Sequence, residues 1–142
     1  MNHRGVTVME LLVITSIAAT VLTLGVLSWR AFQDSMRMTM ASRAITQALH
    51  TARALAIESG LPTRAYWDGQ AMLVQEQGEP GWRTRSTFQP DPRVSVRANA
   101  SPIFFGSGLA APLCTIELRG ARCGCRITLS IAGRIRTCRT SR

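Results

Sequence analysis

Two places in the sequence combine charged residues with a spacing that could do chemistry. Near the start, Gly5 precedes Glu10 by five positions, and the stretch from Leu11 to Trp29 that follows carries no charge. Near the end, Gly133-Arg134-Ile135-Arg136 lies in a segment that contains no carboxylate after Glu117. The first pattern requires a group that neutralises a carboxylate at the start of an apolar helix. The second indicates a surface that binds anions.

Glu10 needs a compensating group, because an unpaired charge in the core of a bilayer costs roughly 2.5–3.5 kcal/mol. Thr7-x-x-Glu10 has the pattern of a capping box, in which the two side chains satisfy the first turn of a helix. A cap requires neither a glycine at position 5 nor an apolar run behind it. We therefore expect Glu10 to have a second role, and the two roles are compatible.

Arginine supplies every basic side chain of the chain: there are 17 Lys and Arg residues together, all of them Arg, and the formal net charge is +9. Such a balance suggests a polyanionic partner, either nucleic acid or an anionic membrane surface, although an arginine-rich genome would produce the same excess. Seven arginines fall in the last 24 positions: Arg119, Arg122, Arg126, Arg134, Arg136, Arg139 and Arg142.

A turn at Gly133 would place Arg134 and Arg136 on one side of a strand and Ile135 on the other, against the core. Their separation of about 6.6–6.8 Å from the strand rise is comparable with that of successive phosphates, and each guanidinium can bind a phosphate bidentately. Arg134 and Arg136 could therefore bind two successive phosphates, irrespective of base sequence. Charge alone adds Arg119, Arg122, Arg126 and Arg139. The alternatives are a solvated face near lipid headgroups and a face that docks a protein.

The four cysteines lie close together in the sequence, at Cys114, Cys123, Cys125 and Cys138. Behind an exported anchor, this clustering predicts two disulfides in an oxidising compartment. A ring between Cys123 and Cys125 would be very small, so two pairings stay open: Cys114–Cys123 with Cys125–Cys138, or Cys114–Cys125 with Cys123–Cys138. A zinc site is the rival interpretation, but the spacing matches no familiar ligand pattern, and we expect no metal.

No enzyme is expected either. His50 is the one histidine beyond position 5, and no Ser/His/Asp set, paired carboxylates or phosphate-cradling glycine loop accompanies it. We therefore expect no catalytic residue and no cofactor.

The elements that must position these residues are a long helix and a sheet. Residues 6–29 are long enough to span a bilayer, and the basic residues before them place 1–5 in the cytoplasm and the remainder outside it. Residues 30–60 continue as an amphipathic helix, whose buried face is marked by Ala41, Ile45, Leu49, Ala52 and Ala56. Ser59-Gly60-Leu61-Pro62 then ends the helix.

Residues 61–142 have a sequence pattern that predicts a small β-rich domain. Short β-like segments alternate with turn residues and predict strands at 63–67, 72–76, 94–97, 114–119, 126–131 and 134–138. The Pro-, Arg- and Thr-rich stretch 79–93 is interpreted as a loop. The expected fold class is α+β, one long helix packed against an antiparallel sheet.

Residues 5–13, Gly5-Val6-Thr7-Val8-Met9-Glu10-Leu11-Leu12-Val13, resemble the class III signal of type IV prepilins and type II secretion pseudopilins. The resemblance implies a 1–5 leader, cut after Gly5 by a prepilin peptidase that also methylates the amine of Val6. The sequence departs from the family pattern at Val6, where Phe is usual, and at Met9, where Ile is usual. Glu10 of one subunit would then pair with the Val6 amine of its neighbour during filament assembly, a pairing that offsets the burial of both charges.

Together with this signal, the helix end at 59–62, the segment from Cys114 and the Gly-Arg-x-Arg element at 133–136 resemble the GspH/FimT family of minor pilins and pseudopilins. That resemblance implies the type IV pilin fold. In the FimT-like branch, a C-terminal Gly-Arg-x-Arg is linked to DNA binding in natural transformation. The resemblance implies that Arg134 and Arg136 are the first candidates for DNA contact, with Gly133 setting the turn. We therefore expect a minor pilin, anchored in the cell inner membrane with its domain in the periplasm, that joins other pilins in a pilus and binds double-stranded DNA. The alternative is a structural pseudopilin of a type II secretion system.

Overall fold

The computed structural model describes residues 7–121 and 123–141, with the side chains of residues 24, 27 and 139–141 left out. The described chain separates into two compact units, which divide between Gln33 and Asp34. One helix, α1 (Val8–Ser59), contributes to both units.

The first unit consists of the start of α1. The backbone N–H of Glu10 donates to Thr7 Oγ1 over 3.3 Å, and the N–H of Leu11 donates to the Thr7 carbonyl over 3.1 Å. Thr7 thus caps the helix, and this half of the predicted capping box is confirmed. The helix is long and apolar enough to cross a membrane by length and composition, and its side chains from position 8 to position 32 are exposed where they are described.

The second unit builds its core on the remainder of α1. The five residues predicted to mark the buried face, from Ala41 to Ala56, are each at most 1% exposed, so the predicted buried face is confirmed. Met38 and Ala48 extend the same stripe. Alanines occupy most of it, and their small side chains let strands approach the helix closely. The helix ends at Ser59, and Gly60 follows with a positive φ of 70°, as a C-terminal glycine does.

In the described part of the chain, nine strands follow the helix. They are β1 (Thr63–Trp67), β2 (Met72–Gly78), β3 (Gly81–Phe88), β4 (Ser95–Ala98), β5 (Ile103–Phe104), β6 (Ala110–Ala111), β7 (Cys114–Arg119), β8 (Cys123–Leu129) and β9 (Ile135–Ser141). They form a five-stranded sheet in the order β3-β2-β1-β5-β6 and a four-stranded sheet in the order β4-β7-β8-β9, and every strand pairing is antiparallel.

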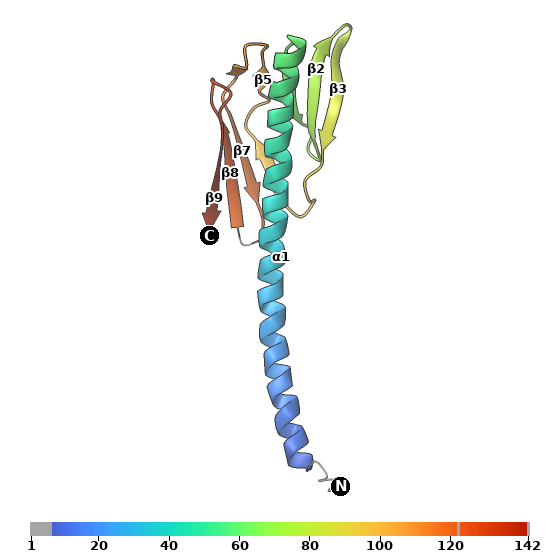
Figure 1. The fold of residues 1–142 in the computed structure, drawn as a ribbon, viewed down its shortest axis with the longest axis vertical. Helices are drawn as coiled ribbons and strands as arrows, with labels where there is room; N and C mark the ends of the chain where they lie inside the picture. The colour runs from blue at the N-terminus through green and yellow to red at the C-terminus, as the bar shows by residue number, and fades with distance from the viewer. Residues whose placement is uncertain (1–6, 122, 142) are drawn as a thin grey trace. The chain divides into compact units, whose positions relative to one another are not determined.

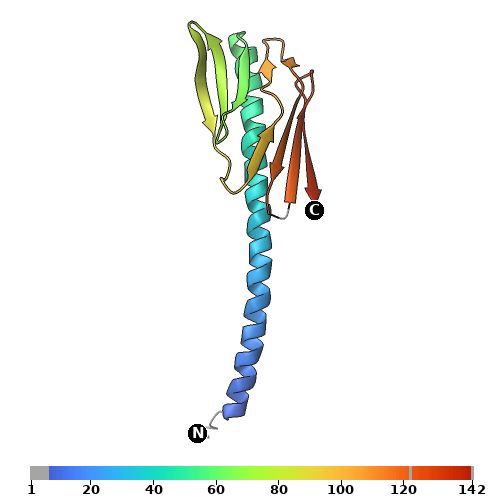
Figure 2. The ribbon, with the colours of Figure 1, turned by 180° about the vertical axis from the view of Figure 1, so that it is seen from behind.

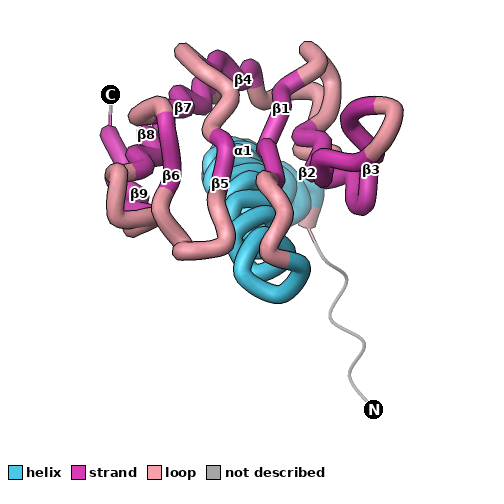
Figure 3. The backbone as a smooth tube through the Cα atoms, turned by 90° about the horizontal axis from the view of Figure 1, so that it is seen from above, coloured by secondary structure: helices cyan, strands magenta, loops and turns pink. Residues whose placement is uncertain are grey.

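Figure 1 shows β7, β8 and β9 on one side of the C-terminal half of α1 and β2 and β3 on the other, and Figure 2 shows the same two groups from behind. Seen along the helix in Figure 3, the strands curve around α1 and leave one of its sides uncovered. Each sheet therefore turns one face toward the helix and core, and the other face toward solvent. Phe104, Ile116, Leu118 and Ile127 fill the space between helix and sheets.

The α+β fold class is confirmed, and the strands at 63–67 and 114–119 are found at the predicted bounds. The interpretation of 79–93 as a loop is wrong, because β3 occupies 81–88. The side chains of this edge strand are mostly exposed, so its sequence lacks the apolar alternation that would predict a strand. Its strand conformation depends on pairing with β2. The predicted strand at 126–131 is shifted: β8 begins at Cys123, and Ser130 and Ile131 belong to the turn that follows it.

Candidate nucleic-acid interface

The β8–β9 connection positions the first two candidate arginines. The N–H of Ser130 donates to the Arg134 carbonyl over 3.0 Å, the N–H of Arg134 donates to Ser130 Oγ over 3.2 Å, and the N–H of Gly133 donates to the Ser130 carbonyl over 2.9 Å. Gly133 has a φ of 69°, the left-handed conformation that a three-residue hairpin loop requires at this position. The prediction that Gly133 closes the turn is confirmed.

Gly133 also occupies a crowded place. A Cβ on it would collide with the carbonyl oxygen of Gly108 and would meet the guanidinium of Arg53. Arg53 reaches from α1, and its Nη1 donates to the Gly133 carbonyl over 3.1 Å, while the N–H of Ala110 donates to the Ile131 carbonyl over 2.8 Å. The turn is thus fixed from two sides, which holds Arg134 at a defined position before any ligand binds.

Strand register places Arg136 and Arg126 on the same side of the four-stranded sheet. Arg136 pairs with Thr128, two residues from Arg126, and both arginines are exposed. Ile135 pairs with Leu129 and packs against the core, as predicted. We call this solvent side the outer face; its charged residues are Arg97, Glu117, Arg119, Arg126 and Arg136, with Arg134 at its edge.

A groove of about 570 Å³ lies where the turn meets the outer face. Arg134 and Arg136 line it together with Leu113, Thr115 and Thr128. Among the described residues, no carboxylate forms an ion pair with either arginine. Both guanidinium groups therefore keep their charge-assisted hydrogen bonds for an incoming anion.

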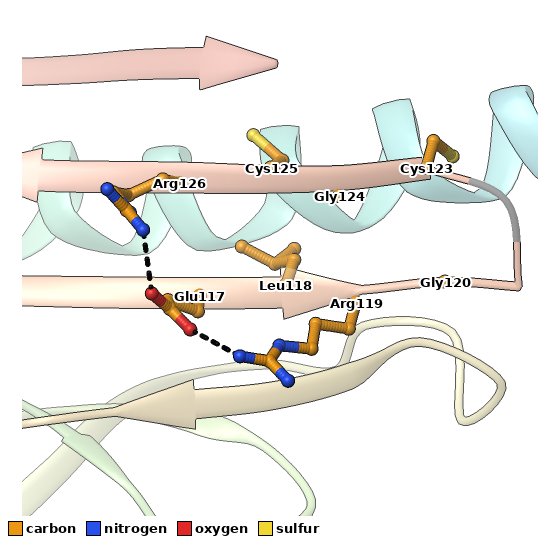
Figure 4. Close-up of a pocket in the computed structure, with 8 residues that line it drawn as sticks. All are labelled: Glu117, Leu118, Arg119, Gly120, Cys123, Gly124, Cys125 and Arg126. Carbon is orange, nitrogen blue, oxygen red and sulfur yellow. Dashed lines mark hydrogen bonds and ion pairs between the residues drawn. The ribbon is translucent and has the colours of Figure 1, made fainter. Parts of the chain in front are cut away.

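Arg119 and Arg126 have a different environment, because Glu117 lies between them (Figure 4). Glu117 Oε2 accepts from Arg119 Nη2 over 3.1 Å, and Oε1 accepts from Arg126 Nη2 over 3.1 Å. Hydrogen bonds from Arg119 and then from Arg126 lower the pKa of Glu117 below its ordinary value of 4.5. Glu117 is thus ionised at neutral pH and competes with phosphate for these two arginines.

Other predicted residues take less defined places. Arg122 lies outside the described residues, and Arg139 pairs through its backbone with Cys125 while its side chain is not described. Sequence reasoning missed Arg97, which lies on β4 opposite Glu117, although the alternation of residues 94–97 could have revealed it. Nothing in the sequence indicated Arg53, because its contact with the turn is 80 residues away along the chain.

The predicted disulfides do not occur. No disulfide joins any two of the four cysteines, all of which lie within the described residues. Both predicted pairings need Cys114, yet the β7–β8 register sets Cys114 four positions from Cys125 and six from Cys123, about 13 and 20 Å from the strand rise. A disulfide requires Cα atoms within about 7 Å. Cys138 pairs with Arg126 and is exposed, whereas Cys125 is buried on the opposite side of the sheet.

The amino-terminal site is only partly described. Gly5 and Val6, the predicted cleavage and methylation site, lie outside the described residues. Glu10 is exposed in the first turn of α1. Within the described residues, no group of three or more His, Cys, Asp or Glu side chains is placed to hold a metal ion.

Known proteins resemble this chain in fold more than in sequence. No protein-family model matches it, and no curated protein matches it. Its structure is similar to the crystal structure of the type IV minor pilin FimU from Pseudomonas aeruginosa, with a TM-score of 0.61 and 16% sequence identity; the match covers 74% of this chain and 90% of FimU. The chain therefore has the type IV pilin fold, one long N-terminal helix packed on antiparallel sheets.

Proposed function

We propose that the chain is a minor type IV pilin that binds extracellular double-stranded DNA through its outer face during natural transformation. The pilin part of the proposal is supported by the fold shared with the minor pilin FimU and by an amino-terminal helix that is apolar enough to anchor the protein in a membrane. Cleavage after Gly5 by a prepilin peptidase would expose the Val6 amine, and Glu10 of an incoming subunit would pair with that amine of its neighbour in the filament. The membrane is the inner membrane, with the second unit in the periplasm.

One observation carries the DNA-binding part of the proposal. The outer face and its edge bring five arginines from four strands and one turn to a single solvent-exposed side of the sheet, where Glu117 is the one carboxylate among the described positions. Guanidinium groups gathered on one face bind phosphates irrespective of base sequence. No aromatic side chain occupies a described strand position on this face, so stacking on bases does not contribute here.

The test is binding of a labelled DNA duplex by the full-length protein in detergent, measured by fluorescence anisotropy over a range of salt concentrations. Arg134→Ala/Arg136→Ala should weaken binding and reduce the slope of log K against log salt by about 1.8, since each lost phosphate contact removes about 0.9. Arg43→Ala/Arg83→Ala is the matched control, because it removes two exposed arginines that lie off the outer face. Equal binding by both double variants would refute the proposed DNA site.

A structural pseudopilin of a type II secretion system is the second candidate. Exposed apolar side chains around the arginine turn favour it, because exposed apolar side chains that gather in one place mark a surface for binding a protein. They are Ile57, Leu109, Leu113 and Ile131. A protein whose duplex binding does not depend on Arg134 and Arg136, but which binds other pseudopilins through these residues, would support this candidate.

A further inference from the structure

A second arginine site lies on the five-stranded sheet, away from the outer face. In the β1–β2–β3 meander, Arg64 pairs with Gln75, Gln75 pairs with Thr84, and Trp82 pairs with Gln77. The neighbouring strand positions Ala65 and Val74 are buried, so the polar set lies on the solvent side of the sheet. We call it the stacking face; it consists of Arg64, Tyr66, Gln75, Trp82 and Thr84.

The guanidinium of Arg64 lies over two aromatic rings. Its Cζ is 4.4 Å from the centroid of Trp82 and 5.3 Å from that of Tyr66. Arg64 Nε donates to Gln75 Oε1 over 2.7 Å, and Gln75 Nε2 donates to Thr84 Oγ1 over 3.1 Å. The hydrogen bonds fix the plane of the guanidinium, so three planar groups, two on β1 and one on β3, form one preorganised surface.

Within the part of the chain that the structure describes, no carboxylate matches the charge of Arg64, in contrast to a neighbouring arginine. On the opposite side of the same hairpin, Arg85 forms an ion pair with Glu76 at 2.6 Å. No carboxylate among the described residues pairs with Arg64, and the described strand positions of the stacking face carry no acidic residue. The face therefore combines flat π surfaces with an uncompensated positive charge.

A ligand that satisfies both properties has planar rings and a negative backbone. Nucleic acid has this chemistry, but in a duplex the ring faces are covered by neighbouring base pairs, so only unpaired bases can stack on protein side chains. Tyr66 is exposed and Trp82 is half-buried, which leaves ring area for a base, and the guanidinium can contact the adjoining phosphate.

We propose that the stacking face binds unpaired nucleotides of single-stranded DNA. The inference shares with the proposed function only the class of ligand, DNA, because its residues lie on the other sheet. The protein would then have two DNA sites with different preferences: an outer face that reads phosphates of any DNA, and a stacking face that requires free bases.

The test compares two probes on the full-length protein in detergent: oligothymidine of about 16 nucleotides, the upper end of common single-strand site sizes, and a duplex of the same length. Trp82→Leu keeps an apolar side chain but removes the indole. It should weaken oligothymidine binding by roughly 5- to 150-fold, the equivalent of about 1–3 kcal/mol for one stacked base, and leave duplex binding unchanged. Arg64→Gln should weaken oligothymidine binding more than Arg83→Gln, which makes the same charge change on the opposite side of the sheet.

Tyr66→Leu provides a second test on β1 in case Trp82→Leu disturbs the β2–β3 hairpin, which thermal unfolding would reveal. Loss of oligothymidine binding in a folded Trp82 or Tyr66 variant, with duplex binding intact, supports the proposal. It is overturned if folded variants bind oligothymidine as the wild type does, or lose both probes equally. The outer face is tested separately by the Arg134→Ala/Arg136→Ala variant, which should weaken duplex binding while the Trp82 and Tyr66 variants keep it. The two proposals can therefore fail independently.

Discussion

Glu117→Gln should increase the affinity of the outer face for DNA. Glu117 accepts one hydrogen bond from Arg119 and one from Arg126, each over 3.1 Å, and these arginines are 69% and 59% exposed whereas Glu117 is 30% exposed. The carboxylate is therefore positioned to occupy two guanidinium groups that a phosphate could reach. Glutamine has the same shape without the charge, so the substitution releases both groups and raises the net charge of the face by one.

The size of the effect depends on whether one or both of the released arginines bind a phosphate. One additional phosphate steepens the slope of log K against log salt by about 0.9, and two steepen it by about 1.8. Between roughly 50 and 200 mM salt, the affinity of the variant would therefore fall by an additional factor of about 3.5 for one phosphate or about 12 for two. At the lower salt concentration the variant would bind more tightly than the wild type.

The assay is a salt titration of duplex binding by fluorescence anisotropy, with Glu79→Gln as control, because Glu79 is an exposed carboxylate in the turn between β2 and β3. The pKa of Glu117 is lowered by Arg119 and Arg126, so the wild-type carboxylate stays ionised, and the difference should persist from about pH 7 to about pH 5. A Glu117→Gln variant that has the same salt slope as Glu79→Gln would refute the role of Glu117 as a competitor of phosphate.

Three further predictions concern stability, each measured by thermal or denaturant unfolding. Gly133→Ala should cost at least about 1 kcal/mol more than Gly60→Ala, because both glycines have a φ near 70° but only a Cβ at Gly133 collides with a neighbouring carbonyl; equal losses would contradict this. Ile45→Ala should cost about 2–5 kcal/mol, whereas Ile57→Ala on the same helix should have little effect, since their exposures are 0% and 52%. Hydrogen bonds from Ser59 and then from Arg85 lower the pKa of Glu76 below 4.5. The contribution of Glu76 to stability is therefore full above pH 4.5 and is lost as the pH falls through the lowered pKa. Glu76→Gln should flatten this acid dependence of the unfolding free energy, and an unchanged pH profile would contradict the role of Glu76.

Residues that form local structure could be predicted from the sequence. The buried stripe of α1 follows from apolar residues spaced by three and four positions, and the turn at Gly133 follows from a glycine between two β-like segments. Both predictions are confirmed at the predicted residues. The β3 strand could not be found in this way. Its side chains are mostly exposed, and only its pairing with β2 holds it in the sheet, which is a non-local interaction.

The candidate site shows the same division between local and non-local information. Alternation in one strand correctly separated Arg136 from Ile135. Which arginines share a face depends on the register of four strands, and that register added Arg97 and excluded the predicted disulfide pairings. Cysteine spacing along the chain carried no information on the distance between Cys114 and its expected partners. Cys114 begins β7 and Cys123 begins β8, and the first residues of two successive antiparallel strands lie at opposite ends of the ladder.

The structure also supplies a physical reason for ranking the arginines. Charge alone makes Arg119 and Arg126 equivalent to Arg134 and Arg136, yet the first pair shares Glu117 and the second pair has no carboxylate partner among the described residues. A phosphate must displace an existing hydrogen bond to reach the first pair, whereas the second lines an open groove beside a turn that Arg53 holds in place. Arg134 and Arg136 should therefore contribute most to DNA binding in the wild type. Arg119 and Arg126 should reach the same importance only when Glu117 is neutral, and removing them in a Glu117→Gln background is the measurement that separates charge from availability.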